Sequence, residues 1–355
     1  MHILQLAITA LLVALLPLTV VWVSADQNKY RKLIAVTLFL TFDLIMFGAF
    51  TRLTDSGLGC PDWPGCYGEA NPFLAHASIK AAEAIMPTGP VSVQKAWIEM
   101  IHRYLAMAVG VLIVAQMIIA WRDRIKGRKV LSSPWLPTGL FFFVCLQGAF
   151  GAWTVTLKLQ PVIVTTHLLL GMGLLGLLAW LSAQQSVHQY VANRSLVMPA
   201  TLALLLLVIQ IALGGWVSTN YAALACHDYP LCSGAVIPQM DFEHGFTLWR
   251  QLGQKANGEF LPFQALVAIH WVHRNFALLV ITVVAWAAFK ATKTAGLENL
   301  GKGLLAVIAV QFLSGVSTIF FSWPLLIAVI HNGGAALLLL LLCMLNYRAR
   351  LASKH

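Results

Sequence analysis

The sequence predicts an all-α integral membrane protein, built from two four-helix-bundle repeats that run in the same direction and one extra N-terminal transmembrane helix. Composition is the first observation behind this prediction. The chain has 355 residues, is 59% hydrophobic and only 10% charged, and its mean hydropathy is +0.79. A soluble domain carries roughly 25% charged residues, so lipid must cover most of this surface. A repeated set of motifs is the second observation.

Nine apolar runs are long enough to cross about 30 Å of hydrocarbon. They are residues 3–24, 33–52, 100–120, 137–156, 164–184, 198–218, 268–289, 302–321 and 325–346. The first run lacks the basic start and the small-residue cleavage site of a signal peptide. We therefore expect it to remain as a transmembrane helix.

Loop charges predict the orientation. Most Lys and Arg residues, including the run "RDRIKGRK" at 122–129, fall in one set of loops, which is therefore expected on the cytoplasmic side. The net charge of +10 is then explained by the basic residues of the cytoplasmic loops. We therefore expect the chain to contact a lipid bilayer and to bind no nucleic acid. Asp43 lies inside a predicted span and has no assigned role.

The repeat is read from three aligned segments. "GAFTRLTDSGLGCPDWPGCYG" (48–68) aligns without a gap with 214–234, and "IEMIHRYLAM" (98–107) matches "IHWVHRNFAL" (269–278). In a third segment, three residues match at one constant spacing along the chain: Gln147 with Gln311, Gly151 with Gly315, and His167 with His331. The predicted organisation is an extra helix in 1–28, a first repeat in 29–190 and a second in 191–355. Four spans per repeat place both copies in one direction, as in parallel-repeat membrane folds.

Each copy contains two cysteines six positions apart, in a loop expected on the non-cytoplasmic side. Thiols there persist as disulfides, so we predict two bridges, Cys60–Cys66 and Cys226–Cys232. A metal site, short of ligands with two thiolates per loop, and a redox-active pair are the alternatives. Cys145 and Cys343 lie within spans and are typical of small core residues.

Four histidines lie near the non-cytoplasmic ends of predicted spans, on the second and fourth helix of each repeat: His102, His167, His273 and His331. One such histidine would usually be a core residue, but four at one depth indicate a function. Two imidazoles from facing helices are a common way to hold a haem iron. Zinc would need more ligands, and a proton relay would need a chain of acids through the span. The pattern therefore predicts one bis-histidine haem site in each half.

Charged residues beside these histidines add detail. Arg103 and Arg274 each follow a histidine directly, and Arg52 occurs in the first copy only. Arginine binds carboxylates such as haem propionates in bidentate fashion; interfacial anchoring is the alternative. Glu99 lies one helical turn before His102, where the second copy has His270. This difference suggests chemistry in the first half, while His270 is expected to be packed or hydrogen-bonded rather than a ligand.

The "GCPDWPGC" loop, the "EMIHR" and "WVHR" helix starts and the "CHDYPLC" loop together resemble the haem A synthase family, over about residues 33–346. The resemblance implies an eight-helix bundle that oxidises the C8 methyl of haem O to a formyl group, giving haem A for cytochrome oxidase. It implies a resident haem b on His273 and His331, a substrate haem between His102 and His167, and Glu99 as the catalytic acid. The helix at 3–24 would be an addition to the eight.

The resemblance also implies a location in a bacterial or mitochondrial inner membrane, with haem O synthase and oxidase assembly factors as partners. Two hydroxylations of the methyl would give a geminal diol that loses water, with Glu99 stabilising a cation or accepting a proton. The electron donor and acceptor are not indicated. The alternative function is a dihaem cytochrome b-type electron carrier or quinol oxidoreductase. A transporter would leave the four histidines unexplained.

Overall fold

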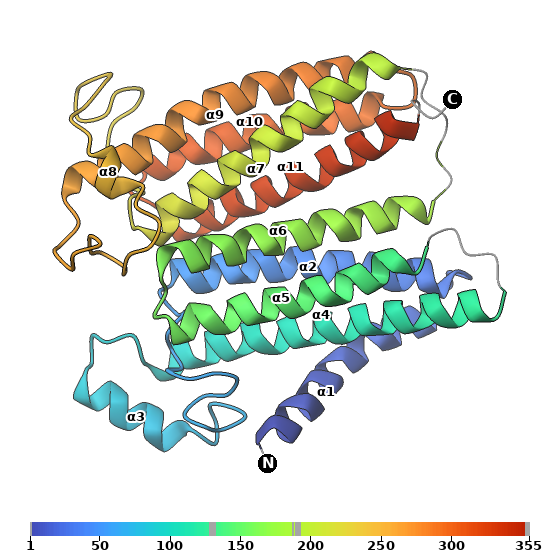
Figure 1. The fold of residues 1–355 in the computed structure, drawn as a ribbon, viewed down its shortest axis with the longest axis horizontal. Helices are drawn as coiled ribbons and strands as arrows, with labels where there is room; N and C mark the ends of the chain where they lie inside the picture. The colour runs from blue at the N-terminus through green and yellow to red at the C-terminus, as the bar shows by residue number, and fades with distance from the viewer. Residues whose placement is uncertain (1, 128–132, 187, 189–192, 352–355) are drawn as a thin grey trace. The chain divides into compact units, whose positions relative to one another are not determined.

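A computed structural model describes residues 2–127, 133–186, 188 and 193–351. Among them, nine helices are long and apolar enough to cross a membrane, and each corresponds to one predicted span, to within one residue at the C-terminal ends of the first and eighth. They are α1 (His2–Val23), α2 (Lys29–Leu53), α4 (Val93–Ile125), α5 (Trp135–Thr156), α6 (Pro161–Gln184), α7 (Val197–Thr219), α9 (Phe263–Thr292), α10 (Glu298–Phe320) and α11 (Leu325–Leu351) (Figure 1). The prediction of an all-α membrane protein is confirmed. Two short helices in the loops, α3 (His76–Ile85) and α8 (Phe242–Gly245), were not predicted.

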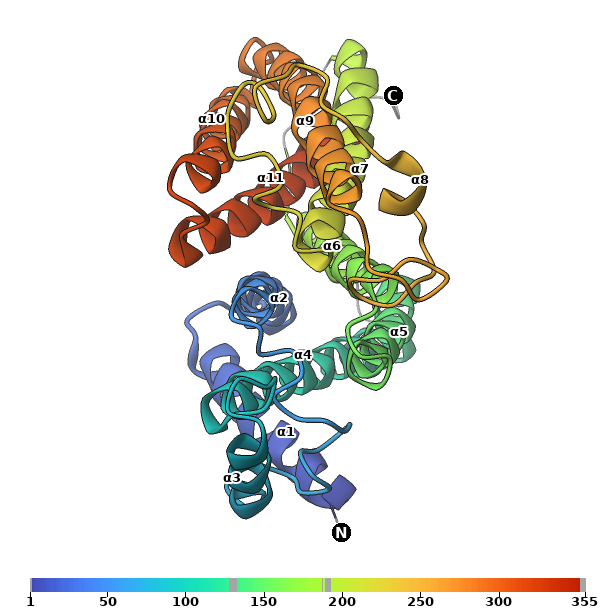
Figure 2. The ribbon, with the colours of Figure 1, turned by 90° about the vertical axis from the view of Figure 1, so that its left-hand side faces the viewer.

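The chain forms two compact units, one of residues 1–159 with 173–186 and the other of 160–172 with 187–355. In the first unit α4 packs against α1, α2 and α5. In the second unit α9 packs against α7 and α10, and α11 packs against α10 and α7. Viewed along the helices, α7, α9, α10 and α11 are arranged around a common axis (Figure 2).

The extra helix α1 is an integral part of the first unit. One stripe of it is buried, with Leu6, Ala10 and Ala14 at a spacing of four residues, while Leu12 and Leu15 on other faces are exposed. Small residues in such a stripe let helix backbones approach closely in a membrane. Leu6 also packs into the cluster that contains the first cysteine pair, so α1 supports the loop end of this unit.

Replacing Ala14 with Leu is expected to destabilise this packing by about 1–3 kcal/mol, because a larger side chain must enter a fully buried position. The measurement is thermal unfolding of the full chain in detergent. Leu15→Ala, on the exposed face of α1, is the matched control and should change stability by less than about 0.5 kcal/mol. Equal stability of the two variants would show that α1 is not held by this stripe.

Candidate functional site

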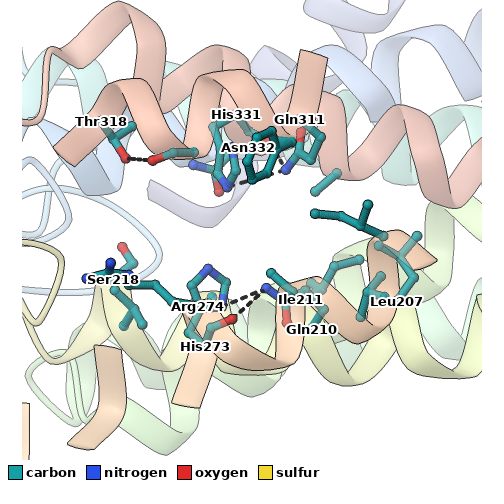
Figure 3. A pocket seen from close by; sticks show the side chains of 18 of the residues that line it. Leu207, Gln210, Ile211, Ser218, His273, Arg274, Gln311, Thr318, His331 and Asn332 are labelled. Carbon is teal, nitrogen blue, oxygen red and sulfur yellow. Dashed lines mark hydrogen bonds between the residues drawn. The ribbon is translucent and has the colours of Figure 1, made fainter. Parts of the chain in front are cut away.

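Two of the predicted histidines share one cavity in the second unit. The cavity encloses about 1260 Å³ including its open mouth, and both His273 on α9 and His331 on α11 line it. Their imidazoles point into it from opposite walls (Figure 3). Most of the other lining residues are apolar, including Leu207, Ile211 and Ile308. A large apolar cavity with a few convergent polar groups is the usual form of a cofactor site.

Glycines on neighbouring helices give these imidazoles their space. An ideal Cβ placed on Gly214 of α7 would lie 3.0 Å from Cε1 of His273, and one placed on Gly315 of α10 would lie 3.0 Å from Cε1 of His331. The same arrangement occurs in the first unit, where a Cβ on Gly48 of α2 would lie 2.9 Å from Cε1 of His102. The repeat alignment marks these glycines, but only the structure shows what they contact.

Polar side chains hold the two rings of the second unit. Gln210 donates through Nε2 to the backbone oxygen of His273 at 3.1 Å and lies 3.1 Å from its Nδ1. Of the two ring nitrogens of His331, Nε2 lies 3.4 Å from Nε2 of Gln311. Ser314 donates to the backbone oxygen of Gln311 at 3.1 Å, and its Oγ lies 2.9 Å from Nδ1 of His331. A partner of this kind on the second ring nitrogen is typical of metal-binding histidines.

The histidines of the first repeat have other surroundings. His102 lies on α4 with its ring nearly parallel to that of Phe47, at a centroid distance of 6.3 Å and an interplanar angle of 17°. Leu44 and Phe150 stand where the sequence repeat has Gln210 and Ser314. His167 lies on α6 in the segment 160–172, which belongs to the second unit. The structure thus brings His273 and His331 together, and the pairing of His102 with His167 stays a prediction.

Glu99 is held by the first cysteine loop. Cys60 and Cys66 form a disulfide, and the backbone N–H of Cys60 donates to Oε2 of the buried Glu99 at 2.8 Å. The other carboxylate oxygen is ion-paired with Arg103. Arg103 also donates to backbone oxygens of the loop, at 2.6 Å for Gly65. Both oxygens of the carboxylate are thus engaged.

His270 takes the corresponding position in the second unit. Cys226 and Cys232 form a disulfide, and the backbone N–H of Cys226 donates to Nδ1 of the buried His270 at 3.1 Å. The imidazole is therefore a hydrogen-bond acceptor for the loop, as Glu99 is in the first unit. Arg274 donates to the backbone oxygen of Leu231 at 3.0 Å, as Arg103 does to its own loop.

The arginines predicted to bind propionates differ in their partners. Arg103 is paired with Glu99, and Arg52 lies 3.2 Å from a carboxylate oxygen of Asp55. Arg274 lines the cavity of the second unit, and its Nη1 is buried without a hydrogen-bond partner among the described residues. Its Nη2 donates to the loop, and its guanidinium carbon lies 5.1 Å from the centroid of the Tyr229 ring. Arg274 is therefore the arginine best able to bind an anion in the cavity.

An aspartate closes each cysteine loop, a role that the sequence alone did not indicate. Asp62 accepts from the backbone N–H groups of Tyr67 and Gly68, both at 2.6 Å. Asp228 accepts in the same way from Ser233 at 2.6 Å and Gly234 at 2.8 Å. Both glycines have positive φ, 74° and 76°, which other residues rarely adopt.

The loop of the second unit is expected to loosen in acid. The N–H groups of Gly234 and Ser233 lower the pKa of Asp228 below its ordinary value of 3.8. A lowered carboxyl pKa contributes stability that is present above the unfolded-state pKa and is lost as the pH falls through the folded-state value. Hydrogen exchange at the Gly234 amide should therefore accelerate below about pH 4 in wild type, after correction for intrinsic exchange. Asp228→Asn should show fast exchange at neutral pH, and wild-type protection in that variant would contradict the role.

Nine helices of spanning length among the described residues, with His273 and His331 on the walls of one apolar cavity, define the class as a multi-pass membrane protein. Comparison with known proteins gives the family. The model of the COX15-CtaA family, described as cytochrome oxidase assembly protein, matches residues 31–343, and the chain belongs to this family.

Named relatives agree with this membership. The chain is 37% identical over 321 residues to the haem A synthase of Shewanella oneidensis, a match that covers 89% of this chain and 95% of the relative. It is 28% identical over 332 residues to the haem A synthase of Sinorhizobium medicae, covering 87% and 86% of the two chains. The resemblance seen in the cysteine loops and helix starts is thereby confirmed.

Proposed function

We propose that this protein is a haem A synthase, which oxidises the C8 methyl of haem O to the formyl group of haem A for cytochrome oxidase. The observation that carries the proposal is the cavity with His273 and His331 on opposite walls, in a chain that belongs to an oxidase assembly family. The activity named for its relatives supplies the reaction. A dihaem electron carrier is not favoured, since the named relatives are synthases.

The second-unit cavity fits a resident haem b. The glycines opposite His273 and His331 leave room for the two rings, and the apolar walls suit a macrocycle. The unpartnered Nη1 of Arg274 offers a donor for a propionate. His273 and His331 would hold the haem iron, and the bound haem would supply one-electron chemistry.

The first repeat would take the substrate. We infer from the repeat that His102 and His167 bind the iron of haem O, with Arg52 and Arg103 as the candidate propionate partners. Each oxidation of the methyl removes two electrons and two protons, and water supplies the oxygen. Two rounds give a geminal diol, which loses water to give the aldehyde. The electron acceptor lies outside this chain, and oxidase assembly factors and a haem O synthase are the expected partners.

Glu99 is assigned to the stabilisation of positive charge that develops on the methyl carbon. Its two oxygens are occupied by Arg103 and the Cys60 N–H, which fixes the orientation of the carboxylate and leaves neither oxygen open to act as a free base. A fixed anion near a developing cation lowers the barrier because it needs no reorganisation. The sites are expected near the non-cytoplasmic side of an inner membrane, where disulfides persist.

Extraction and mass analysis of the co-purified haems test the proposal. Wild type should contain haem b together with haem O or haem A. His273→Ala and His331→Ala should lose haem b, while haem O is retained. Haem b alone, at two per chain, would show an electron carrier and overturn the synthase assignment.

A further inference from the structure

The two cysteine loops use the same hydrogen bonds but differ by one charge. In each unit the first cysteine donates its N–H to a side chain three residues before the predicted ligand, and an arginine one residue after that ligand binds loop carbonyls. The acceptor is the carboxylate of Glu99 in one unit and the imidazole of His270 in the other. Both side chains thus accept a hydrogen bond from the loop, but only Glu99 can carry a negative charge.

The charge changes the state of the neighbouring arginine. Glu99 pairs with Arg103, whose described contacts are this carboxylate and the loop carbonyls. His270 offers no carboxylate, and Arg274 keeps a buried Nη1 without a partner among the described residues. The loop aspartates do not account for the difference, because Asp62 and Asp228 stand at equivalent positions and make equivalent bonds.

No other described arginine beside the predicted site of the first unit takes the place of Arg103. Arg52, which has no counterpart in the second copy, is itself paired with Asp55 at 3.2 Å. Both arginines of the first unit that could face a propionate therefore have carboxylate partners. In the second unit Arg274 lines the cavity and bonds the loop carbonyls of Pro230 and Leu231, and its guanidinium carbon lies 5.1 Å from the centroid of the Tyr229 ring. No carboxylate of the described residues forms a hydrogen bond with its buried Nη1.

We propose that the exchange of Glu99 for His270 decides which haem leaves the protein and which stays. In the first half, Glu99 competes with a propionate for Arg103 and so weakens the hold on substrate and product, which must be exchanged at every turnover. In the second half, the Nη1 of Arg274 has no competing carboxylate among the described residues and binds a propionate, so the haem there is retained. This inference rests on the proposed function, because it requires a haem in each half.

Glu99 and His270 therefore have two roles: each accepts a hydrogen bond from its cysteine loop, and each determines how firmly the haem of its half is held. Arginine–carboxylate pairs are among the strong charge-assisted bonds, and a second carboxylate at hydrogen-bond distance competes directly for the same donors. An interaction of about 1.4 kcal/mol corresponds to tenfold in affinity. We expect changes of that order when the charge is moved from one half to the other.

His270→Glu is the main test, with His270→Gln as the matched control. Glutamate brings a charge and an acceptor, whereas glutamine brings an acceptor alone. The measurement is the rate at which haem b transfers from the purified full-length protein to an apoglobin, followed by absorbance. We expect about tenfold faster loss from His270→Glu and a near wild-type rate from His270→Gln.

The reverse change tests the first half. Glu99→His should slow the transfer of haem O to the apoglobin by about tenfold, with haem b loss unchanged in the same sample. That unchanged rate also shows that the protein is folded. Equal rates for His270→Glu and His270→Gln, or unaltered haem O release from Glu99→His, would overturn the proposal.

These outcomes are separate from a failure of the proposed function. If His273→Ala kept all of its haem b, or if wild type bound no haem O, the haem assignment itself would be wrong. If both assignments held and the transfer rates did not follow the charge, only the retention mechanism would be wrong.

Discussion

Glu99→Gln is expected to bind haem b normally, to bind haem O more tightly, and to form haem A at a rate reduced by about 10²–10³-fold. Glutamine keeps an oxygen that can accept from the Cys60 N–H, so the loop contact at 2.8 Å is preserved. It lacks the negative charge that pairs with Arg103 and that we assign to stabilising the cation. The loss of rate should therefore appear as bound haem O that is not oxidised, and not as a loss of haem O binding. Mass analysis of extracted haems, with haem O accumulating, is the measurement.

A conservative control separates charge from position. Glu99→Asp keeps the charge on a shorter side chain, so it should retain more activity than Glu99→Gln while loosening the loop contact. The amide exchange rate at Cys60 reports that contact independently of turnover. Normal haem A output from Glu99→Gln would remove the catalytic role and leave Glu99 as a loop anchor only.

Much of the fold could be predicted because each membrane-spanning helix satisfies its own backbone within one apolar run. All nine spans correspond to helices, although α4 begins at Val93 and α9 at Phe263, several residues before the predicted starts. Those extra turns carry polar residues such as Gln264 and Lys95, which end an apolar window without ending a helix. The short helices α3 and α8 have no apolar periodicity of spanning length and could not be found in this way.

The sequence predicted which residues belong to the candidate site, but it predicted few of the contacts between them. Histidines and arginines beside spans stand out because ionisable groups are rare there. Hydrogen bonds between residues far apart in sequence leave no such pattern. The contact of Ser314 with His331 and that of Cys226 with His270 depend on how helices and loops pack. Arg103 illustrates the limit, since its sequence neighbour His102 suggested a propionate partner but gave no sign of the ion pair with Glu99.

Gly315→Leu is expected to abolish haem b binding while leaving the helix bundle folded. A Cβ at this position would already lie 3.0 Å from Cε1 of His331, closer than ordinary carbon contacts. The larger leucine must displace the imidazole and with it the contact of Nδ1 with Ser314 at 2.9 Å. A ligand moved by about 1 Å no longer meets the geometry that iron requires. The Soret absorbance per chain is the measurement, and the loss should approach that of His331→Ala.

Gly303→Leu is the matched control on the same helix. Gly303 also lies in α10, but a Cβ added there would meet no atom within 4 Å beyond its own local backbone. Both variants add the same side chain and remove the same glycine, so any gain in helix propensity is shared. Haem content should therefore fall in Gly315→Leu and not in Gly303→Leu. Equal haem content in the two variants would mean that the imidazole of His331 is not confined by α10, and the bis-histidine assignment of this cavity would lose its structural basis.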